Sequence, residues 1–429
     1  MLWLGGCEVS LAEPVGLLLV STLLFYLTFN GRGQRYISDP IFYLFLSCYL
    51  YGTAGYWGNS MLTINAEFLT LDFSDQAYIW SYRATTLSLF GVSIGGLLAT
   101  GIGSIGNIRP NPTLAKVAFL GSIVAVLFAF SFFYTNSFAT DNSHAETLVQ
   151  KKLESYFPYM LLLIPSFSLL CVKSTKEQRR LVLVILVIFA IINFSGGSRR
   201  HVLLMLIVFI SSTVLKGQTF DLKKVAVTSV TLIGIGLFVG ATRGSIGVAK
   251  LFSTYEFLGE RMVFGLTEFV RPYVALLYFL DREGQTYLMG TSFFESLKFI
   301  LPSGLRWYDL PQRLGSQFAV VLQELLNFPR PIGHGFFGIA EVVVNFSIAL
   351  CLPFFVVFSI SIRMLCLIMV KSKCSFMVPV ICVVCYGVGR GGFQHIAFYL
   401  SYTLAFGILI LFSYNFLRFF MSQSNKRNF

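Results

Sequence analysis

The sequence contains few charged residues. Asp, Glu, Lys and Arg together make up 12% of its 429 residues, whereas a soluble domain carries about 25%. A chain with so little charge cannot cover itself with a polar surface, and 55% of its residues are hydrophobic. Apolar runs recur at the length that spans about 30 Å of hydrocarbon. The composition therefore argues against a soluble globular protein and predicts a membrane protein.

Patterns that hold metals, cofactors or disulfides are also scarce. The chain has four His, and we find no H-x-x-x-H pair and no acidic cluster with metal-ligand spacing. No Gly-rich dinucleotide fingerprint follows a predicted strand. Cys382 and Cys385 form a C-x-x-C motif inside the apolar run "FMVPVICVVCYGVG", where a reactive thiolate would lack polar partners. We therefore expect no metal and no cofactor, and we interpret these cysteines as helix-packing residues.

The apolar runs predict an all-α polytopic membrane protein with about eleven transmembrane helices, within a range of about ten to twelve, in a single domain over residues 1–429. The expected spans are 14–29, 39–57, 80–103, 116–135, 157–172, 181–195, 201–215, 225–241, 337–362, 375–389 and 396–417.

The connections between these spans alternate in charge. Every second connection is basic, and the connections between these are acidic or mixed, such as the segment with Glu67, Asp72 and Asp75. The positive-inside rule places the basic connections and the C-terminus in the cytoplasm and the N-terminus outside. It also accounts for the net charge of +12, so we expect no nucleic-acid partner. The basic connections contain Arg32, Arg35, Arg109, Lys116, Lys173, Lys176, Arg179, Arg180, Lys216, Lys223, Lys224, Arg363, Lys371, Lys373, Arg418, Lys426 and Arg427.

The longest connection, residues 242–336, falls on the outside. A structureless loop of that length is unusual in a compact protein. It contains the apolar stretches "EFVRPYVALLYFL" and "SFFESLKFILP". We therefore expect this large loop to contain helices that lie on the membrane or dip into it.

Several arginines lie on the side where positive charge is disfavoured. Arg offers a planar fork that matches phosphate oxygens, and neighbouring glycines let the backbone approach an anion. These arginines are therefore candidates for an anion site, and the alternative is that they extend to lipid phosphates at the membrane surface. They are Arg199 and Arg200 in "SGGSRRH", Arg243 in "TRGSIG", Arg271 in "EFVRPY" and Arg390 in "GRGG".

An acidic residue lies about one turn inside the ninth predicted span. In "RPIGHGFFGIAEVVVNFSIAL", Glu341 and Asn345 are four residues apart and share one helix face, and His334 lies just outside the span. A carboxylate inside a span is a functional-site candidate by default. Glu341 is thus either a catalytic group or a structural partner of a nearby Arg.

At these residues the sequence resembles the bacterial O-antigen polymerases of the Wzy type, within the oligosaccharide repeat-unit polymerase family. The similar segments are "SGGSRRHVLLML", "ATRGSIG", "LMGTSFFESLKFILPSGLRW", "IGHGFFGIAEVVVNFSIA" and "GRGGFQHIAF", which together cover most of residues 180–400.

The resemblance implies a GT-C-like, metal-independent glycosyltransferase of the bacterial inner membrane. It would join undecaprenyl-pyrophosphate-linked oligosaccharide units at the periplasmic face, with membrane lipid around it and a chain-length regulator as a candidate partner. The arginines named above would stabilise the pyrophosphate leaving group. Glu341, His334 and His395 are the candidates for the base that activates the acceptor hydroxyl. An O-antigen ligase and a flippase for the same lipid-linked units remain the alternative functions.

Overall fold

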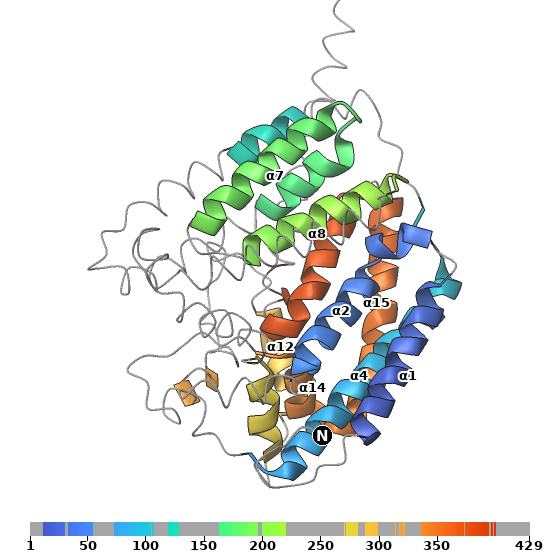
Figure 1. The fold of residues 1–429 in the computed structure, drawn as a ribbon, viewed down its shortest axis with the longest axis vertical. Coiled ribbons are helices and arrows are strands. Elements are labelled where there is room, and N and C mark those ends of the chain that lie inside the picture. The colour runs from blue at the N-terminus through green and yellow to red at the C-terminus, as the bar shows by residue number, and fades with distance from the viewer. Residues whose placement is uncertain are drawn as a thin grey trace, which may run out of the picture.

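Every secondary-structure element in the described part of the computed structural model is helical (Figure 1). This agrees with the predicted all-α class. The structure describes residues 12–30, 33–54, 73–103, 105–106, 119–127, 163–195, 200–219, 270, 272–281, 288–298, 314, 317–318, 320–321, 336–372, 374–393, 396–397 and 399.

A central bundle is built around the longest described helix, α4 (Asp75–Ile102). Three helices pack against α4, namely α1 (Ala12–Phe29), α2 (Pro40–Gly52) and α15 (Cys351–Lys371). Figure 1 shows these four helices side by side, with the helix Met377–Phe393 beside α2. The short 3-10 helix η1 (Gly33–Ser38) lies between α1 and α2 in the chain and contacts α8 (Arg200–Leu215).

Two glycines bring α4 and α15 into close contact. A Cβ atom on Gly91 would lie 2.5 Å from the carbonyl oxygen of Leu352, and one on Gly95 would lie 2.8 Å from that of Val356. Any larger residue would therefore force the two helices apart. Gly91 and Gly95 form a G-x-x-x-G motif, which is typical of close packing between membrane helices because lipid offers no hydrophobic drive for their association.

The remaining described helices lie at the two ends of this bundle. The helix Leu163–Lys173, α7 (Gln178–Ser195) and the helical segment 119–127 lie near α8 in Figure 1. At the opposite end lie the helix Pro272–Asp281, α12 (Thr291–Leu297) and α14 (Gly338–Phe346). Pro272–Asp281 and α12 belong to the large loop 242–336, so the described part of that loop contains helices.

The span predicted at 337–362 is interrupted and shifted along the chain. Helix α14 ends at Phe346, Ser347 adopts a φ of 75°, and a 3-10 turn, η3 (Ile348–Leu350), leads into α15. Just before the break, the Asn345 side chain donates to the backbone carbonyl of Glu341 at 2.7 Å, a local bond of the kind that competes with helical hydrogen bonding. The apolar stretch long enough to cross a membrane is instead Ile348–Lys371.

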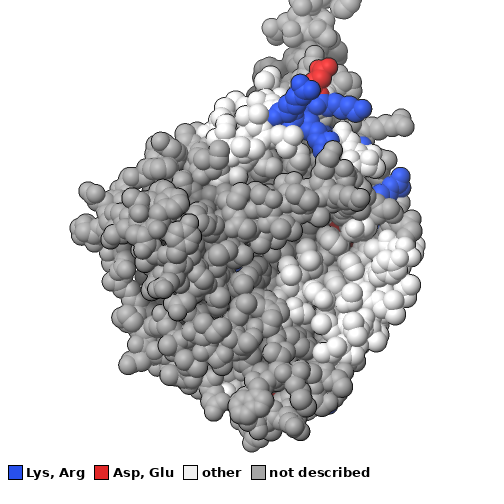
Figure 2. All heavy atoms as spheres, in the orientation of Figure 1, with Lys and Arg blue, Asp and Glu red and all other residues white. Residues whose placement is uncertain are grey.

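Two described helical stretches, Asp75–Ile102 and Ile348–Lys371, are long and apolar enough to cross a membrane. The other described apolar helices are shorter, so the count of about eleven spans stays a prediction. Large apolar side chains face outward on several helices, including Leu19 on α1, Val187 on α7 and Val357 on α15, which are 65%, 56% and 63% exposed. On the face drawn in Figure 2, the Lys and Arg side chains of the described residues lie toward one end of the molecule.

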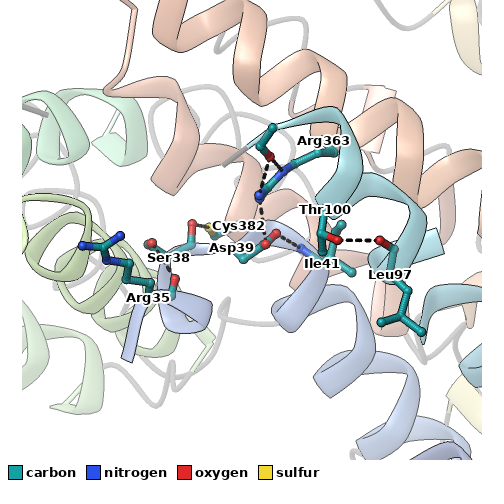
Figure 3. Close-up of polar contacts among 9 residues, drawn as sticks. Arg35, Ser38, Asp39, Ile41, Leu97, Thr100, Arg363 and Cys382 are labelled. Atoms are coloured by element: carbon teal, nitrogen blue, oxygen red, sulfur yellow. Dashed lines mark hydrogen bonds and ion pairs between the residues drawn. The ribbon is translucent and has the colours of Figure 1, made fainter. Parts of the chain in front are cut away.

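A buried ion pair joins three elements at one end of the bundle (Figure 3). Arg363 on α15 donates to Asp39 at 2.7 Å, and both side chains are 5% exposed. The same guanidinium donates twice to the carbonyl of Gly103, at 3.0 and 2.9 Å, just after α4. Asp39 also caps α2 by accepting from the N–H of Ile41. Arg363, which was predicted in a connection between spans, therefore lies inside α15 instead, where its charge is buried and paired with Asp39.

Candidate functional site

Glu341 lies in a buried polar cluster with Ser292 and Asn345. Its side chain is 1% exposed, and its Oε1 accepts from the Ser292 hydroxyl at 3.1 Å. The Asn345 amide donates to the same hydroxyl at 2.7 Å, while its oxygen accepts from the Ser292 N–H at 3.3 Å. Ser292 is therefore held at both its backbone and its side chain, and its hydroxyl proton points toward the carboxylate. The cluster joins α12 of the large loop to α14.

The second carboxylate oxygen accepts from the end of another helix. The N–H of Phe393 donates to Glu341 Oε2 at 2.5 Å. This N–H is available because Gly392 adopts a left-handed φ of 65°, which turns the chain out of the helix Met377–Phe393. A Cβ atom on Gly392 would clash with Glu341 Oε2. Glycine is thus required here both for its backbone conformation and for the close approach of the carboxylate.

Two backbone hydrogen bonds hold the segments around this cluster together. The N–H of Phe336 donates to the carbonyl of Arg390 at 2.8 Å, and the N–H of Leu288 donates to the carbonyl of Val344 at 3.0 Å. Arg390 lies one turn before the Phe393 N–H on the same helix, and its side chain is partly exposed. Glu341 and Arg390, which the sequence nominated separately, therefore belong to one junction.

Aromatic side chains line this junction. The ring centroid of Phe293 lies 5.4 Å from that of Phe346 and 5.2 Å from that of Phe393. The ring centroids of Phe354 and Phe393 are 5.1 Å apart. These apolar rings lower the local dielectric, which strengthens the hydrogen bonds to the Glu341 carboxylate. Glu341 also lies in the first turn of α14, where the helix dipole favours a negative charge.

Further contacts join the large loop to the N-terminal end of α4. The N–H of Ser74, which caps α4, donates to Asp281 Oδ1 at 2.7 Å. The hydroxyls of Ser81 and Tyr273 are hydrogen-bonded to each other, and Tyr273 is fully buried. The helix Pro272–Asp281 is consequently part of the packed core.

The structure describes some of the predicted site residues. It places Glu341 and Arg390 in the junction, and Arg200 is the first residue of α8. His334, His395, Arg199, Arg243 and Arg271 lie outside the described residues, as does the side chain of Arg200.

Two residues that contact Glu341 were not predicted as site residues from the sequence. Ser292 lies in "LMGTSFFESL" and Gly392 in "GRGG", both within quoted motifs, but neither type signals chemistry by itself. What distinguishes them is contact with Glu341, which depends on the fold.

The described residues give no sign of a metal centre, because no three His, Cys, Asp or Glu among them lie close enough to share an ion. The cysteines of the C-x-x-C motif are buried, at 0% and 1% exposure for Cys382 and Cys385. The Cys382 thiol lies 3.8 Å from the carbonyl of Ser38 and packs within the bundle. The burial of these two cysteines suits the helix-packing interpretation.

The chain matches no protein-family model, no curated protein and no solved structure. The resemblance to the O-antigen polymerases therefore rests on the residues quoted from the sequence, and the arrangement around Glu341 is the structural observation on which a function can be argued.

Proposed function

We propose that this protein is a multi-pass inner-membrane polymerase that joins undecaprenyl-pyrophosphate-linked oligosaccharide units at the periplasmic face. The observation that carries the proposal is the junction at Glu341. There a buried carboxylate and the helix end bearing Arg390 are joined by hydrogen bonds from Phe393 and Phe336. A polymerase of this kind needs a base for the acceptor and a cation for the leaving pyrophosphate, and this junction supplies one candidate for each.

In the proposed reaction, a hydroxyl oxygen of the incoming unit attacks the anomeric carbon of the growing glycan. The bond between that carbon and the pyrophosphate oxygen breaks, and undecaprenyl pyrophosphate leaves with the bonding electron pair. The hydroxyl proton passes to Glu341. Arg390 stabilises the charge that develops on the pyrophosphate, together with the predicted Arg199, Arg200, Arg243 and Arg271.

The position of Ser292 suggests how an acceptor would reach Glu341. In the described state the Ser292 hydroxyl donates to Oε1, the place that an acceptor hydroxyl must occupy to transfer its proton. An acceptor that displaces this donor replaces one hydrogen bond with another of the same kind. The Asn345 amide would keep its hydrogen bond to the displaced Ser292 hydroxyl. On this proposal the resting cluster keeps the carboxylate oriented until substrate arrives.

The two ends of the bundle support the proposed topology. At one end the buried pair of Asp39 and Arg363 meets Gly103, all three from segments predicted on the cytoplasmic side or beside it. At the other end Asp281 meets Ser74, from segments predicted on the periplasmic side. Each hydrogen bond thus joins residues expected on the same side of the membrane, as a multi-pass topology requires.

Deleting the gene in its host and separating the lipopolysaccharide on a gel tests the function. A polymerase acts before ligation, so the mutant should carry lipid A–core with at most one repeat unit, and the wild-type gene on a plasmid should restore the ladder. If the mutant carries no repeat unit at all, the chain is a ligase or a flippase and the proposal fails. An unchanged ladder would exclude a role in this polymer.

A further inference from the structure

Five basic residues meet where two short connections come together at the end of the molecule opposite Glu341. One is the segment 173–180, which runs from the last residue of the helix Leu163–Lys173 into the first residues of α7, and the other is 216–218, after α8. Only one acidic residue, Glu177, lies within these two connections. The basic residues, hereafter the basic cluster, are Lys173, Lys176, Arg179, Arg180 and Lys216. Figure 2 shows Lys and Arg side chains gathered beside an acidic side chain at this end.

Specific hydrogen bonds hold the two connections together. Lys216 Nζ donates to the carbonyl and the hydroxyl of Ser174 at 2.5 and 2.8 Å, and Arg179 donates to the side chain of Gln218. Arg179 also lies 5.5 Å from the ring centre of Phe209, which holds its guanidinium in a cation–π contact. The inner cations of the basic cluster are therefore fixed in place by the fold.

Both helix ends that carry the basic cluster are capped. Thr175 and Gln178 form a reciprocal capping box at the start of α7, with backbone-to-side-chain distances of 3.0 and 3.4 Å. Gly217, with a φ of 75°, ends α8, and the N–H of Gln218 donates to the carbonyl of Thr213. These caps leave Lys176 and Arg180 exposed on a rigid base.

Within the basic cluster, the inner cations Arg179 and Lys216 repel each other. The pKa of Lys216 is lowered from its usual value of 10.5 to about 8, mainly by burial; Cys171 opposes this shift and the nearby Arg179 contributes to it. Glu177 is the one acidic residue in these two connections, so it offsets only part of this positive charge. An anion at this place would relieve the repulsion.

An exposed apolar face begins directly beside the basic cluster. Leu181, Val184 and Ile188 on α7 are 44%, 52% and 48% exposed, and they lie on one side of the helix. Cations at the end of an outward-facing apolar wall match the boundary between lipid headgroups and acyl chains. A soluble polyanion would not account for the apolar wall.

We infer that the basic cluster is a binding site for an anionic phospholipid, whose headgroup phosphate contacts Lys176 and Arg180 while its acyl chains lie along α7. The inner residues Arg179 and Lys216 supply the fixed positive field, and the exposed pair makes the direct contacts. This inference concerns the end of the protein away from Glu341, so it stands or fails separately from the polymerase proposal.

Native mass spectrometry of the detergent-solubilised full chain, titrated with phosphatidylglycerol or phosphatidylcholine, tests the site. Each basic residue near an anionic headgroup contributes about 1 kcal/mol, so Lys176→Ala combined with Arg180→Ala should weaken phosphatidylglycerol retention about 30-fold. The matched control combines Arg35→Ala with Lys371→Ala, two exposed basic residues on other elements of the bundle. We expect the control to change retention less than about threefold.

A second variant gives an effect of opposite sign. Glu177→Gln removes the acidic residue of these connections and should tighten phosphatidylglycerol binding about fivefold, which a misfolded protein could not do. Equal retention of phosphatidylcholine, an equal loss in the control, or no gain with Glu177→Gln would overturn the inference. Displacement of the lipid by millimolar inorganic phosphate would also overturn it, because the site would then bind free phosphate instead of a lipid.

Discussion

Replacing Gly392 with Ala tests the geometry of the Glu341 site. The new Cβ would clash with Glu341 Oε2 and would lie 3.4 Å from the carbonyl oxygen of Phe336. Alanine in the left-handed conformation costs about 1–2 kcal/mol, and loss of the Phe393 hydrogen bond to a charged oxygen costs about 1.5–3 kcal/mol. Gly392→Ala should therefore destabilise the protein by about 3 kcal/mol.

The same helix supplies a matched control. A Cβ atom on Gly387 would meet no atom within 4 Å, and Gly387 has no positive φ. Because alanine is the better helix former, Gly387→Ala should be neutral or stabilising by up to about 1 kcal/mol.

Thermal unfolding of both variants in a mild detergent gives the first readout, and the lipopolysaccharide ladder of a complemented deletion strain gives the second. Gly392→Ala should unfold several degrees below Gly387→Ala and should make little polymer even at matched protein levels. If the two variants melt together and both restore the ladder, the carboxylate does not depend on the close approach at Gly392, and the reasoning about this junction is wrong.

Four further outcomes are expected. Glu341→Gln keeps the shape but removes the base, so polymer should fall at least about 100-fold while protein abundance holds, and a normal ladder would exclude Glu341 from the chemistry. Arg390→Lys should damage polymer formation nearly as much as Arg390→Ala, because a point charge cannot form the paired contact with phosphate. A full ladder from the Lys variant would show that this position needs only a positive charge. Asp39→Asn leaves the Arg363 guanidinium buried without its carboxylate and should cost about 3–5 kcal/mol in thermal unfolding, whereas Asp39→Asn with Arg363→Met should recover most of that loss. Phosphatidylglycerol retention should weaken about fivefold from pH 7 to pH 9, since the Lys216 amine, with its pKa near 8, loses its charge over that range, and Lys216→Arg should abolish this dependence.

Three neighbouring groups act on the Lys216 amine. Ser174 accepts its hydrogen bonds, Arg179 repels its positive charge, and Cys171 favours that charge. Because the pKa is lowered in the folded protein, Lys216 is charged below pH 8 and neutral above it. Anion binding should therefore be strongest on the acidic side of that value, and retention that rises with pH would contradict the assignment.

The sequence alone predicted the helical class and one part of the site. Spacing by four residues predicted that Glu341 and Asn345 share a helix face, and in the structure the Asn345 amide donates to the Glu341 carbonyl. This was predictable because a helix fixes the relation between residues three or four apart. The end of α4 at Ile102 and the helical ranges of α7 and α8 likewise lie within a few residues of the predicted spans, because an apolar run sets their length, whereas α4 starts five residues before the predicted span.

The tertiary structure decided which distant segments meet. Glu341 contacts Ser292 and the N–H of Phe393, which lie 49 and 52 residues away in the chain, and Arg363 contacts Asp39 across 324 residues. No local pattern encodes such contacts. They depend on how helices pack, and in a chain where most positions are apolar many packings satisfy the same hydropathy. Small residues select among these packings, because glycines such as Gly91 and Gly392 set how closely two backbones approach, and that distance decides which polar groups come within hydrogen-bonding range.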